Sequence, residues 1–440
     1  MIAGLILEYL LIGIMPNLYL IGQIVGKNMT LFEIVSWFFL LIIIFVPIRK
    51  NFSLKKMKKL SFGTDLLILF LLTTATNITI FTVAVMNGSL YGAKSRLIYG
   101  LIVFLSEFFV FWSGIIRVYI YSKQVSLKLK LLGIFFGFVP IVNLILLIKI
   151  ISVAKAEVSY ETKFENEQLA RDGKNLCSTK YPILLVHGVF FRDNKLLNYW
   201  GRIPEVLKRN GADLFYGQQQ SALAVKDSAL ELHNKIQEVL KQTGAEKVNV
   251  IAHSKGGLDT RYAISKYGAD KYIASLTTVN TPHRGCIFVD YLFSVIPESM
   301  RNKMASTYNA GAKKLGDTTP DFIAAVTDLS GSACEIFNSE VKDSPNVYYQ
   351  SVGSMSRNAK SGRFPLNVSY PLVKAKDGDN DGLVAVTSMK WGDNFKFVSV
   401  NGKRGVTHAD MIDLNRENIP DFNVRSFYVD LVIDLKNKGF

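Results

Sequence analysis

Cysteine is scarce in this 440-residue sequence, which contains only Cys177, Cys286 and Cys334. Three thiols cannot build a disulfide framework, and their spacing fits neither a zinc knuckle nor a CxxC redox pair. The scarcity therefore excludes a small disulfide-stabilised scaffold and a cysteine-ligated zinc domain. We interpret the three side chains as buried or incidental thiols that form at most one bridge.

Acidic residues are scarce in the first third of the chain. Residues 1–155 contain 15 lysines and arginines but only 4 acidic residues, a balance of +11, whereas residues 156–440 contain 36 basic and 32 acidic residues, a balance of +4. The cations of the first segment lie between apolar runs, as they do in the cytoplasmic loops of membrane proteins. The net charge of +15 is therefore not the signature of a nucleic-acid binder, and we predict no nucleic-acid partner.

Long apolar runs fill that first third. Each is close to the ~20 residues needed to cross a bilayer, and they lie at 2–25, 31–48, 65–86, 97–121 and 131–153. Residues 1–153 are therefore predicted to form an all-α transmembrane bundle of about five helices. Glu8, Pro16 and Asn17 interrupt the first run, so a re-entrant or shorter segment is the alternative there. A cleaved signal peptide is not expected, because no basic segment precedes the first run and more runs follow it.

The basic loops predict an orientation. The segment "RKNFSLKKMKK" at 49–59 has six basic residues and no acid, so it is expected in the cytoplasm, and the lysine-rich loop at 122–130 lies on the same side by this count. A true fifth span would then place everything after it on the outer face of the cell membrane, which is our prediction. The alternative is a hairpin around Pro140 and Asn143, which would leave the rest of the chain in the cytoplasm.

The pattern changes after a polar segment at 154–180, which is predicted to be a linker or a solvated helix. Short apolar runs typical of strands follow at 183–186, 248–252, 274–279, 347–352 and 395–400. They alternate with amphipathic helical stretches such as 225–241. This alternation predicts that residues 181–440 form an α/β domain, with a mainly parallel sheet covered by helices on both faces.

The stretch "VNVIAHSKGGLDTRY" at 248–262 runs from a predicted strand through a serine into a predicted helix. A nucleophilic serine must project from a tight turn, and small residues two before and two after it allow the strand and the helix to approach. Ala252 and Gly256 occupy those positions around Ser254. Ala252 departs from the G-x-S-x-G pattern by one methyl group, and a plain strand-to-helix connection is the alternative.

A catalytic base for such a serine follows it in the chain, after the acid. This order excludes His187 and His233. His253 adjoins the serine and is expected to point away from it, while His283 in "NTPHRGC" directly follows a strand and is expected to be structural. His408 in "GVTHADMIDL" remains as the candidate base.

The candidate acid lies in "DGDNDGLVAV", where Asp381 directly precedes a glycine turn. Asp377 and Asp379 are the alternatives. An aspartate there can accept a hydrogen bond from the imidazole and stabilise the imidazolium. The same stretch begins like a calcium-binding loop, but its twelfth position is Ser388 instead of a bidentate glutamate. A looser calcium site is the remaining alternative use of these carboxylates.

Acyl transfer also needs backbone N–H donors for the developing oxyanion. One is expected from Lys255, the residue after the serine. The other is expected from Val189, which follows a strand and a His-Gly pair in "LLVHGVFFRD".

The stretches "VHGVFFRD", "AHSKGGLDTRY", "TPHRGC", "DNDGLV" and "THADM" together resemble the bacterial triacylglycerol lipases of the α/β-hydrolase fold, over about residues 175–440. The resemblance implies Ser254 as nucleophile, Asp381 as acid, His408 as base, and Val189 and Lys255 as oxyanion donors. It also implies a mobile lid near 288–315, for which a helix buried in the core is the alternative.

Some members of that family bind a structural calcium through an aspartate two residues after the base. Asp410 matches this position, but no second aspartate of the pair is found. We therefore predict no cofactor and no metal.

These observations predict a membrane-anchored serine lipase or carboxylesterase that hydrolyses lipid esters at the bilayer. A lipid acyltransferase or a phospholipase with the same catalytic residues is one alternative. Another is a non-enzymatic membrane protein with an inactive hydrolase-like domain, because Glu8, Glu33 and Glu107 lie within the apolar runs and acidic residues in membrane segments are functional candidates.

Overall fold

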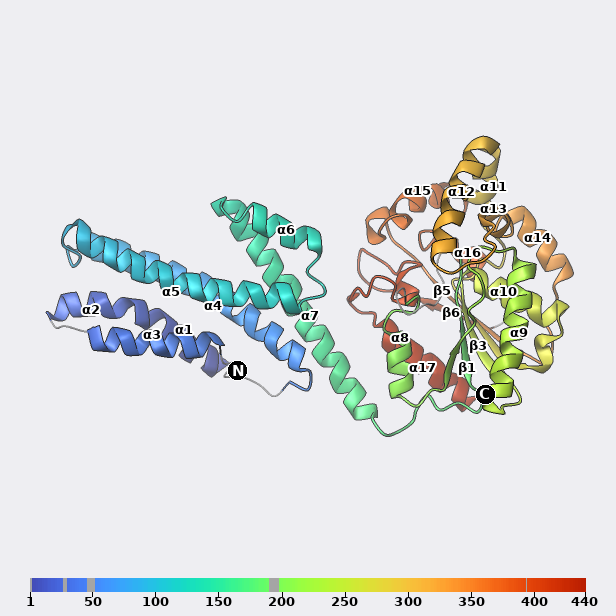
Figure 1. Ribbon diagram of the computed structural model, residues 1–440, viewed down its shortest axis with the longest axis horizontal. Coiled ribbons are helices and arrows are strands. Elements are labelled where there is room, and N and C mark those ends of the chain that lie inside the picture. Colours follow the sequence, from blue (N-terminus) through green and yellow to red (C-terminus); the bar gives the residue numbers. More distant parts are fainter. Residues whose placement is uncertain (1, 27–29, 46–51, 190–197, 393) are drawn as a thin grey trace. The chain divides into compact units, whose positions relative to one another are not determined.

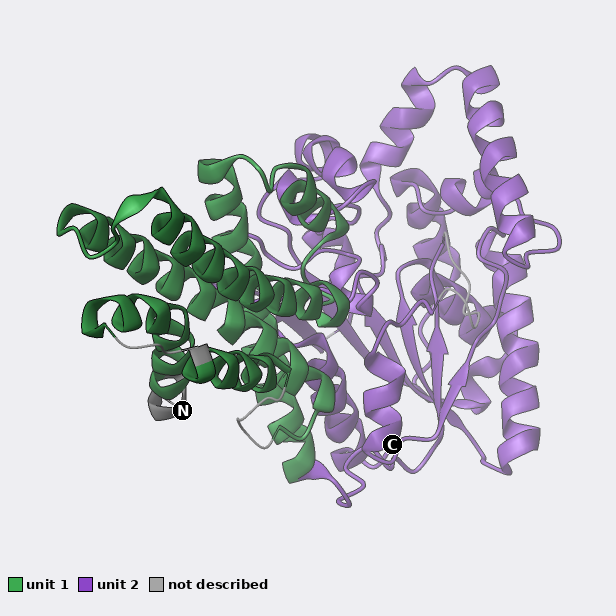
Figure 2. Ribbon diagram, turned by 60° about the vertical axis from the view of Figure 1, so that its left-hand side comes forward, with its two compact units in different colours: residues 1–170 green, residues 171–440 purple. Residues whose placement is uncertain are grey.

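The computed structural model describes residues 2–26, 30–45, 52–189, 198–392 and 394–440. The chain divides into two compact units, Met1–Ala170 and Arg171–Phe440, which Figure 2 shows in different colours. Each unit is described by itself.

The described residues of the first unit form helices joined by short connections (Figure 1). Its elements are α1 (Ile2–Ile14), η1 (Met15–Asn17), α2 (Leu18–Val25), α3 (Thr30–Phe45), α4 (Lys55–Met86), α5 (Gly92–Tyr121), α6 (Leu127–Phe135) and α7 (Pro140–Arg171). The two longest apolar helices, α4 and α5, run side by side. The two helices approach closely at Gly63 and Gly114, since a Cβ added at either glycine would lie only 3.0 Å from the carbonyl oxygen of the other. Small residues commonly allow such an approach where membrane helices cross.

A polar network lies inside this apolar bundle. The Glu107 carboxylate accepts hydrogen bonds from Thr73 Oγ1 at 3.0 Å and from Asn77 Nδ2 at 2.9 Å. Asn77 in turn accepts a hydrogen bond from Asn17 Nδ2 at 2.9 Å. The network joins η1, α4 and α5, so Glu107 has a clear structural role in holding the bundle together.

Three helical segments in the described residues are long and apolar enough to cross a membrane: Ile6–Val25, Lys55–Met86 and Gly92–Tyr121. The predicted second span corresponds to a shorter apolar helix, Leu31–Phe45. The structure differs from the predicted fifth span, because α6 ends at Phe135 and α7 begins at Pro140. Proline disfavours a helical conformation in the residue before it, which explains the break. The α7 helix then continues through most of the predicted linker, to Arg171.

The second unit is built on one sheet with the strand order β2-β1-β3-β4-β5-β6, and every pair is parallel. The strands are β1 (Ile183–Val186), β2 (Leu214–Tyr216), β3 (Val248–His253), β4 (Ile273–Val279), β5 (Tyr348–Ser354) and β6 (Phe395–Val398). The five predicted strands are all present, with ends shifted by at most two residues. The sequence did not indicate β2, because its three residues are too few to show a period.

Helices cover both faces of the sheet and gather beyond one of its ends. They are α8 (Ile203–Arg209), α9 (Val225–Thr243), α10 (Lys255–Lys266), α11 (Ile287–Val295), α12 (Glu298–Lys314), α13 (Phe322–Thr327), α14 (Gly331–Glu340), α15 (Leu366–Lys376), α16 (Val386–Met389) and α17 (Val424–Asn437). Figure 1 shows α8 and α17 on one side of the sheet and α9 and α10 on the other, with α11, α12, α13 and α15 beyond one end.

All residues of β1, β3 and β4 are buried, as expected for central strands covered on both faces. The predicted α/β fold is therefore confirmed.

Candidate active site

Ser254 lies at the sharp turn between β3, which ends at His253, and α10, which begins at Lys255. Its φ of 55° and ψ of −131° are rare for a residue with a side chain, and such strain persists only where the surroundings fix it. The backbone of Ser254 is held on both sides, since its N–H donates to Val279 O at 2.9 Å and its carbonyl accepts from Thr281 Oγ1 at 2.8 Å.

The small residues around the turn have the predicted steric role. A Cβ added at Gly256 would lie 2.5 Å from the carbonyl oxygen of His187. A Cβ added at Gly188, on the loop after β1, would lie 2.7 Å from Ser254 Cβ. Ala252 is fully buried within β3, so the strand accommodates its methyl group. The turn thus needs small residues on both sides of the serine.

The structure brings Asp381 and His408 together. His408 Nδ1 lies 2.7 Å from Asp381 Oδ2, and the backbone N–H of His408 donates to Asp381 O at 2.9 Å. The Asp381 carboxylate is fully buried and also accepts from the backbone N–H groups of Leu383 at 2.9 Å and Val384 at 2.8 Å. These donors stabilise the ionised carboxylate, which can therefore hold the imidazole in one orientation.

The two alternative aspartates have other partners. Asp377 accepts hydrogen bonds from the backbone N–H groups of Ile287 at 2.7 Å and Phe288 at 2.9 Å, at the start of α11. Asp379 pairs with Lys374. Of the three, Asp381 is the one that contacts His408.

The predicted oxyanion donors lie on two different segments near the serine, Lys255 directly after it and Val189 in the loop after β1. Lys255 is the first residue of α10, where backbone N–H groups have no partner within the helix and the helix dipole favours negative charge. Val189 is buried and lines a cavity together with Ser254 and His408. Residues 190–193, the second half of "VHGVFFRD", lie outside the described residues.

The loop that carries Val189 is anchored by polar contacts. His187 Nε2 lies 2.8 Å from Gln219 O, and Gln219 Nε2 donates to His187 O at 2.9 Å. The next residue, Gly188, donates its N–H to Tyr199 Oη at 2.9 Å. These bonds hold the backbone next to the serine.

Two residues at the site, Asn280 and Tyr199, were not predicted from the sequence. Asn280, which directly follows β4, donates from Nδ2 to Asp381 Oδ2 at 2.6 Å. Tyr199 Oη lies 2.7 Å from His253 Nδ1. The centre of the His253 ring lies 4.4 Å from the centre of the His408 ring. Asn280 had a signal in the sequence, since polar residues that follow buried strands meet at the carboxyl edge of a parallel sheet. Tyr199 had none.

His253 lines the same cavity as Ser254 and packs against His408. Burial, together with the neighbouring His408, lowers the pKa of His253 well below its ordinary value. His253 therefore stays neutral at pH 7 and carries no positive charge beside His408. His283, as predicted, is structural: its Nε2 lies 2.9 Å from Thr278 Oγ1 and its ring stacks on Trp391.

The carboxylates considered for calcium are held by other groups. Asp410 forms an ion pair with Arg404 and accepts the backbone N–H of Thr407 at 2.8 Å. Within the described ranges, no group of three or more His, Cys, Asp or Glu side chains could hold a metal ion. The expectation of no cofactor remains a prediction.

The side chain of Lys255 is buried and pairs with Asp259. Lys255 Nζ lies 2.7 Å from Asp259 Oδ1 and donates to Ser228 Oγ at 2.8 Å. Asp259→Ala would leave a buried, unpaired ammonium, so we expect it to lower the free energy of unfolding by about 3–5 kcal/mol. The measurement is urea denaturation of the full chain in detergent, followed by tryptophan fluorescence.

The matched control for this pair is the double variant Lys255→Met/Asp259→Leu. Because it removes both charges and keeps apolar volume, we expect it to unfold close to the wild type. If Asp259→Ala had the same free energy of unfolding as the double variant, the ion pair of Lys255 and Asp259 would not stabilise the fold.

A largely apolar cavity of about 300 Å³ opens beside Ser254 and His408. Its apolar walls include residues of α11 and α13, namely Phe288, Val289, Leu292, Phe293, Phe322 and Val326. A mostly apolar cavity with a few polar side chains is typical of a small-molecule binding site.

The predicted lid corresponds to α11 and α12. One face of α11 lines the cavity through Val289 and Phe293, while Ile287 and Val295 on the same helix are more than half exposed. Met300 on α12 is also more than half exposed. The pair therefore differs from the alternative of a helix buried in the core. Opening of these helices remains a prediction.

Comparison with known proteins supports the fold. Residues 181–373 match the family model described as alpha/beta hydrolase fold. The chain is 31% identical over 174 residues to the triacylglycerol lipase of Pseudarthrobacter phenanthrenivorans, covering 37% of this chain and 54% of that protein. It is 26% identical over 292 residues to triacylglycerol lipase 2 of Saccharomyces cerevisiae, covering 62% of this chain and 81% of that protein. Among solved structures, the mature form of Bacillus licheniformis lipase BlEst2 aligns with a TM-score of 0.42 and 21% identity, over 58% of this chain and 92% of that one.

These matches confirm the predicted resemblance to bacterial triacylglycerol lipases. The chain spans about half the length of the curated bacterial relatives that it matches at 31% identity. The family match includes Val189 and Ser254, whereas Asp381 and His408 lie beyond its last residue.

Proposed function

We propose that this chain, an α/β hydrolase through its second unit, is a serine lipase or carboxylesterase that acts on lipid esters at a membrane. The observation that carries the proposal is the 2.7 Å contact of His408 with buried Asp381, beside the cavity that Ser254 and His408 both line. This arrangement provides a nucleophile, a base, an acid that orients the base, and an acyl-binding wall.

In the proposed reaction, His408 Nε2 accepts the proton of Ser254 Oγ as this oxygen attacks the ester carbonyl. The backbone N–H groups of Val189 and Lys255 stabilise the resulting oxyanion. The carbon–oxygen bond to the alcohol breaks, the alcohol leaves with the proton from His408, and an acyl-enzyme remains on Ser254. Water then repeats the sequence and releases the fatty acid. Asp381 keeps the imidazole oriented and stabilises its charged form.

The apolar surface supports a lipid substrate. The cavity wall and the exposed side chains of α11 and α12 would both contact apolar material, and a lid that opens at an interface exposes them together. The helices of the first unit would anchor the enzyme where such esters are concentrated.

The side of the membrane follows from the helices that cross it. Our prediction of the outer face depended on a fifth span, and the structure has two helices, α6 and α7, in that stretch. With the loops at 49–59 and 122–130 in the cytoplasm, a hairpin of α6 and α7 would keep the hydrolase unit there. We therefore propose the cytoplasmic face for this unit.

The function is tested by labelling the full chain in detergent with a fluorophosphonate probe and by assaying p-nitrophenyl esters of increasing chain length. We expect the probe on the peptide that contains Ser254, and higher kcat/KM for medium and long acyl chains than for acetate, because the longer chains bury more apolar surface in the cavity.

A folded protein without label and without hydrolysis would contradict the proposal and favour an inactive binding domain. Transfer of the acyl group to an added alcohol in preference to water would instead favour an acyltransferase.

A further inference from the structure

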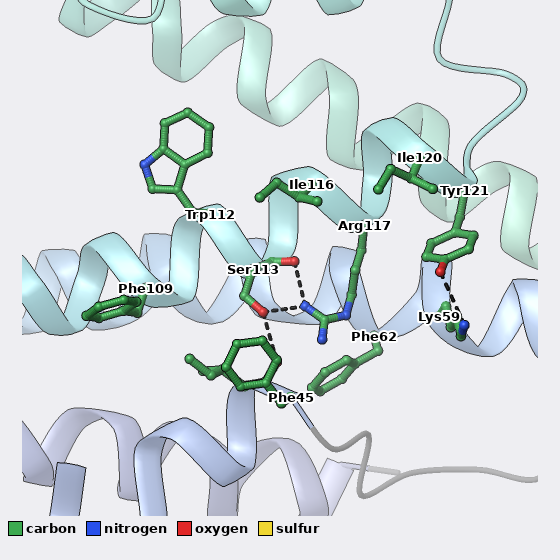
Figure 3. A pocket seen from close by; sticks show the side chains of 11 residues that line it. Phe45, Lys59, Phe62, Phe109, Trp112, Ser113, Ile116, Arg117, Ile120 and Tyr121 are labelled. Carbon is green, nitrogen blue, oxygen red and sulfur yellow. Dashed lines mark hydrogen bonds between the residues drawn. The ribbon is translucent and has the colours of Figure 1, made fainter. Parts of the chain in front are cut away.

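A second cavity, of about 520 Å³, lies within the first unit. It is bounded by the end of α3, the first turns of α4 and the second half of α5 (Figure 3). Most of its lining is apolar, and Phe62, Phe109, Trp112 and Ile116 contribute to it. Its charged lining residues in the described part of the chain are two cations, Lys59 and Arg117, and no acidic side chain is among them.

Arg117 is held in place by its neighbours. Its Nη1 donates to Ser113 O at 2.7 Å and also to Ser113 Oγ, and its guanidinium carbon lies 5.1 Å from the centre of the Phe62 ring. Figure 3 shows the guanidinium between these two side chains. Both of these hydrogen bonds use Nη1, and among the described residues Nε and Nη2 have no hydrogen-bond acceptor, so they can donate to a ligand in the cavity.

The glycine crossing of α4 and α5 fixes the position of Arg117. A Cβ added at Gly63 would lie 2.8 Å from Arg117 Cβ, so the base of the arginine side chain packs directly against the α4 backbone. Lys59, one helical turn earlier on α4, donates from Nζ to Tyr121 Oη at 3.2 Å. Both cations therefore line one cavity and are held by contacts between α4 and α5.

The ligand chemistry follows from charge and location. A guanidinium inside an apolar bundle is costly unless an anion accompanies it, and Arg forms forked hydrogen bonds with phosphate. Both cations lie at the end of the bundle where α4 begins and α5 ends, next to sequence segments that are predicted to be cytoplasmic. Anionic phospholipids are abundant in that leaflet.

We propose that this cavity binds one anionic glycerophospholipid, with the phosphate at Arg117 and Lys59 and an acyl chain along Phe109, Trp112 and Ile116. The proposal rests on the proposed membrane insertion of the first unit. It does not depend on hydrolysis at Ser254.

Native mass spectrometry of the full chain in detergent tests the proposal, with dioleoyl phosphatidylglycerol and dioleoyl phosphatidylcholine as probes. We expect phosphatidylglycerol to bind about tenfold more tightly, because each cation near a lipid phosphate favours the anionic lipid severalfold. Arg117→Gln and Lys59→Gln should each reduce this preference about threefold to fivefold. Arg117→Lys keeps the charge and should retain most of it.

Lys94→Gln is the matched control, since it removes a lysine from the opposite end of α5 and should leave the preference unchanged. Lys59 is exposed, so Lys59→Gln should fold even where an Arg117 variant does not. Equal affinity for the two lipids, or a preference that neither variant reduces, would overturn the proposal. Release of the lipid by millimolar inorganic phosphate would also overturn it, by showing a phosphate site without lipid contacts.

Hydrolysis of p-nitrophenyl butyrate by the wild-type chain is measured in parallel. A wild type that hydrolyses the ester but shows no lipid preference would remove this inference alone. A wild type with the lipid preference but no hydrolysis would remove only the proposed function. Carbonate extraction of membranes tests the insertion itself.

Discussion

Ser254→Ala is expected to lower kcat/KM for p-nitrophenyl butyrate by about 10⁴- to 10⁶-fold, the range found when the nucleophile of a serine hydrolase is removed. The substitution removes the hydroxyl of Ser254, which lies at the turn between β3 and α10 and lines the cavity. Because the backbone hydrogen bonds of residue 254 to Val279 and Thr281 do not involve its side chain, the fold should persist. The measurement is steady-state kinetics of the full chain in detergent.

Ser339→Ala is the matched control, because Ser339 is an exposed serine on α14. We expect its kcat/KM to equal that of the wild type, and thermal unfolding should show that both variants are folded. Activity of Ser254→Ala within about tenfold of the wild type would rule out the acyl-enzyme mechanism.

Asp381→Asn is expected to lower kcat by about 10³- to 10⁴-fold with little change in KM. An amide can no longer stabilise the imidazolium, and its NH₂ group can hold His408 in the wrong tautomer. The carboxylate also accepts two backbone N–H groups and the Asn280 amide, so the variant would lose a charge at which several donors converge. Burst kinetics with a chromogenic ester would show whether formation of the acyl-enzyme is the slowed step.

Asp379→Asn is the matched control from the same loop. Its carboxylate pairs with Lys374 at the surface, and we expect kcat within about twofold of the wild type, since exposed ion pairs contribute little. If Asp379→Asn or Asp377→Asn reduced kcat more than Asp381→Asn did, the assignment of the acid would be wrong.

Local sequence was sufficient for features that depend on neighbouring residues. The strand before Ser254 and the helix after it follow from side-chain alternation and from small residues at 252 and 256, which are properties of a short segment. Apolar length likewise predicted the spans now seen as α4 and α5. The fifth predicted span shows the limit of such reasoning. Pro140 is visible in the sequence and made a hairpin the alternative, but apolar length alone could not decide between one helix and the two that the structure has.

The order of Ser254, Asp381 and His408 along the chain was enough to select them as candidates. Whether they contact one another depends on how the chain packs. Asp377, Asp379 and Asp381 have the same chemistry within five positions, and only the path of the loop turned Asp381 toward His408.

The sequence likewise could not show that Asn280 donates a hydrogen bond to Asp381, or that the Arg117 guanidinium lies over the Phe62 ring. The amino-acid sequence by itself determined which chemical groups are present and in what order. Tertiary structure alone decided which of them meet, because distances between residues far apart in the chain are set by how strands and helices pack.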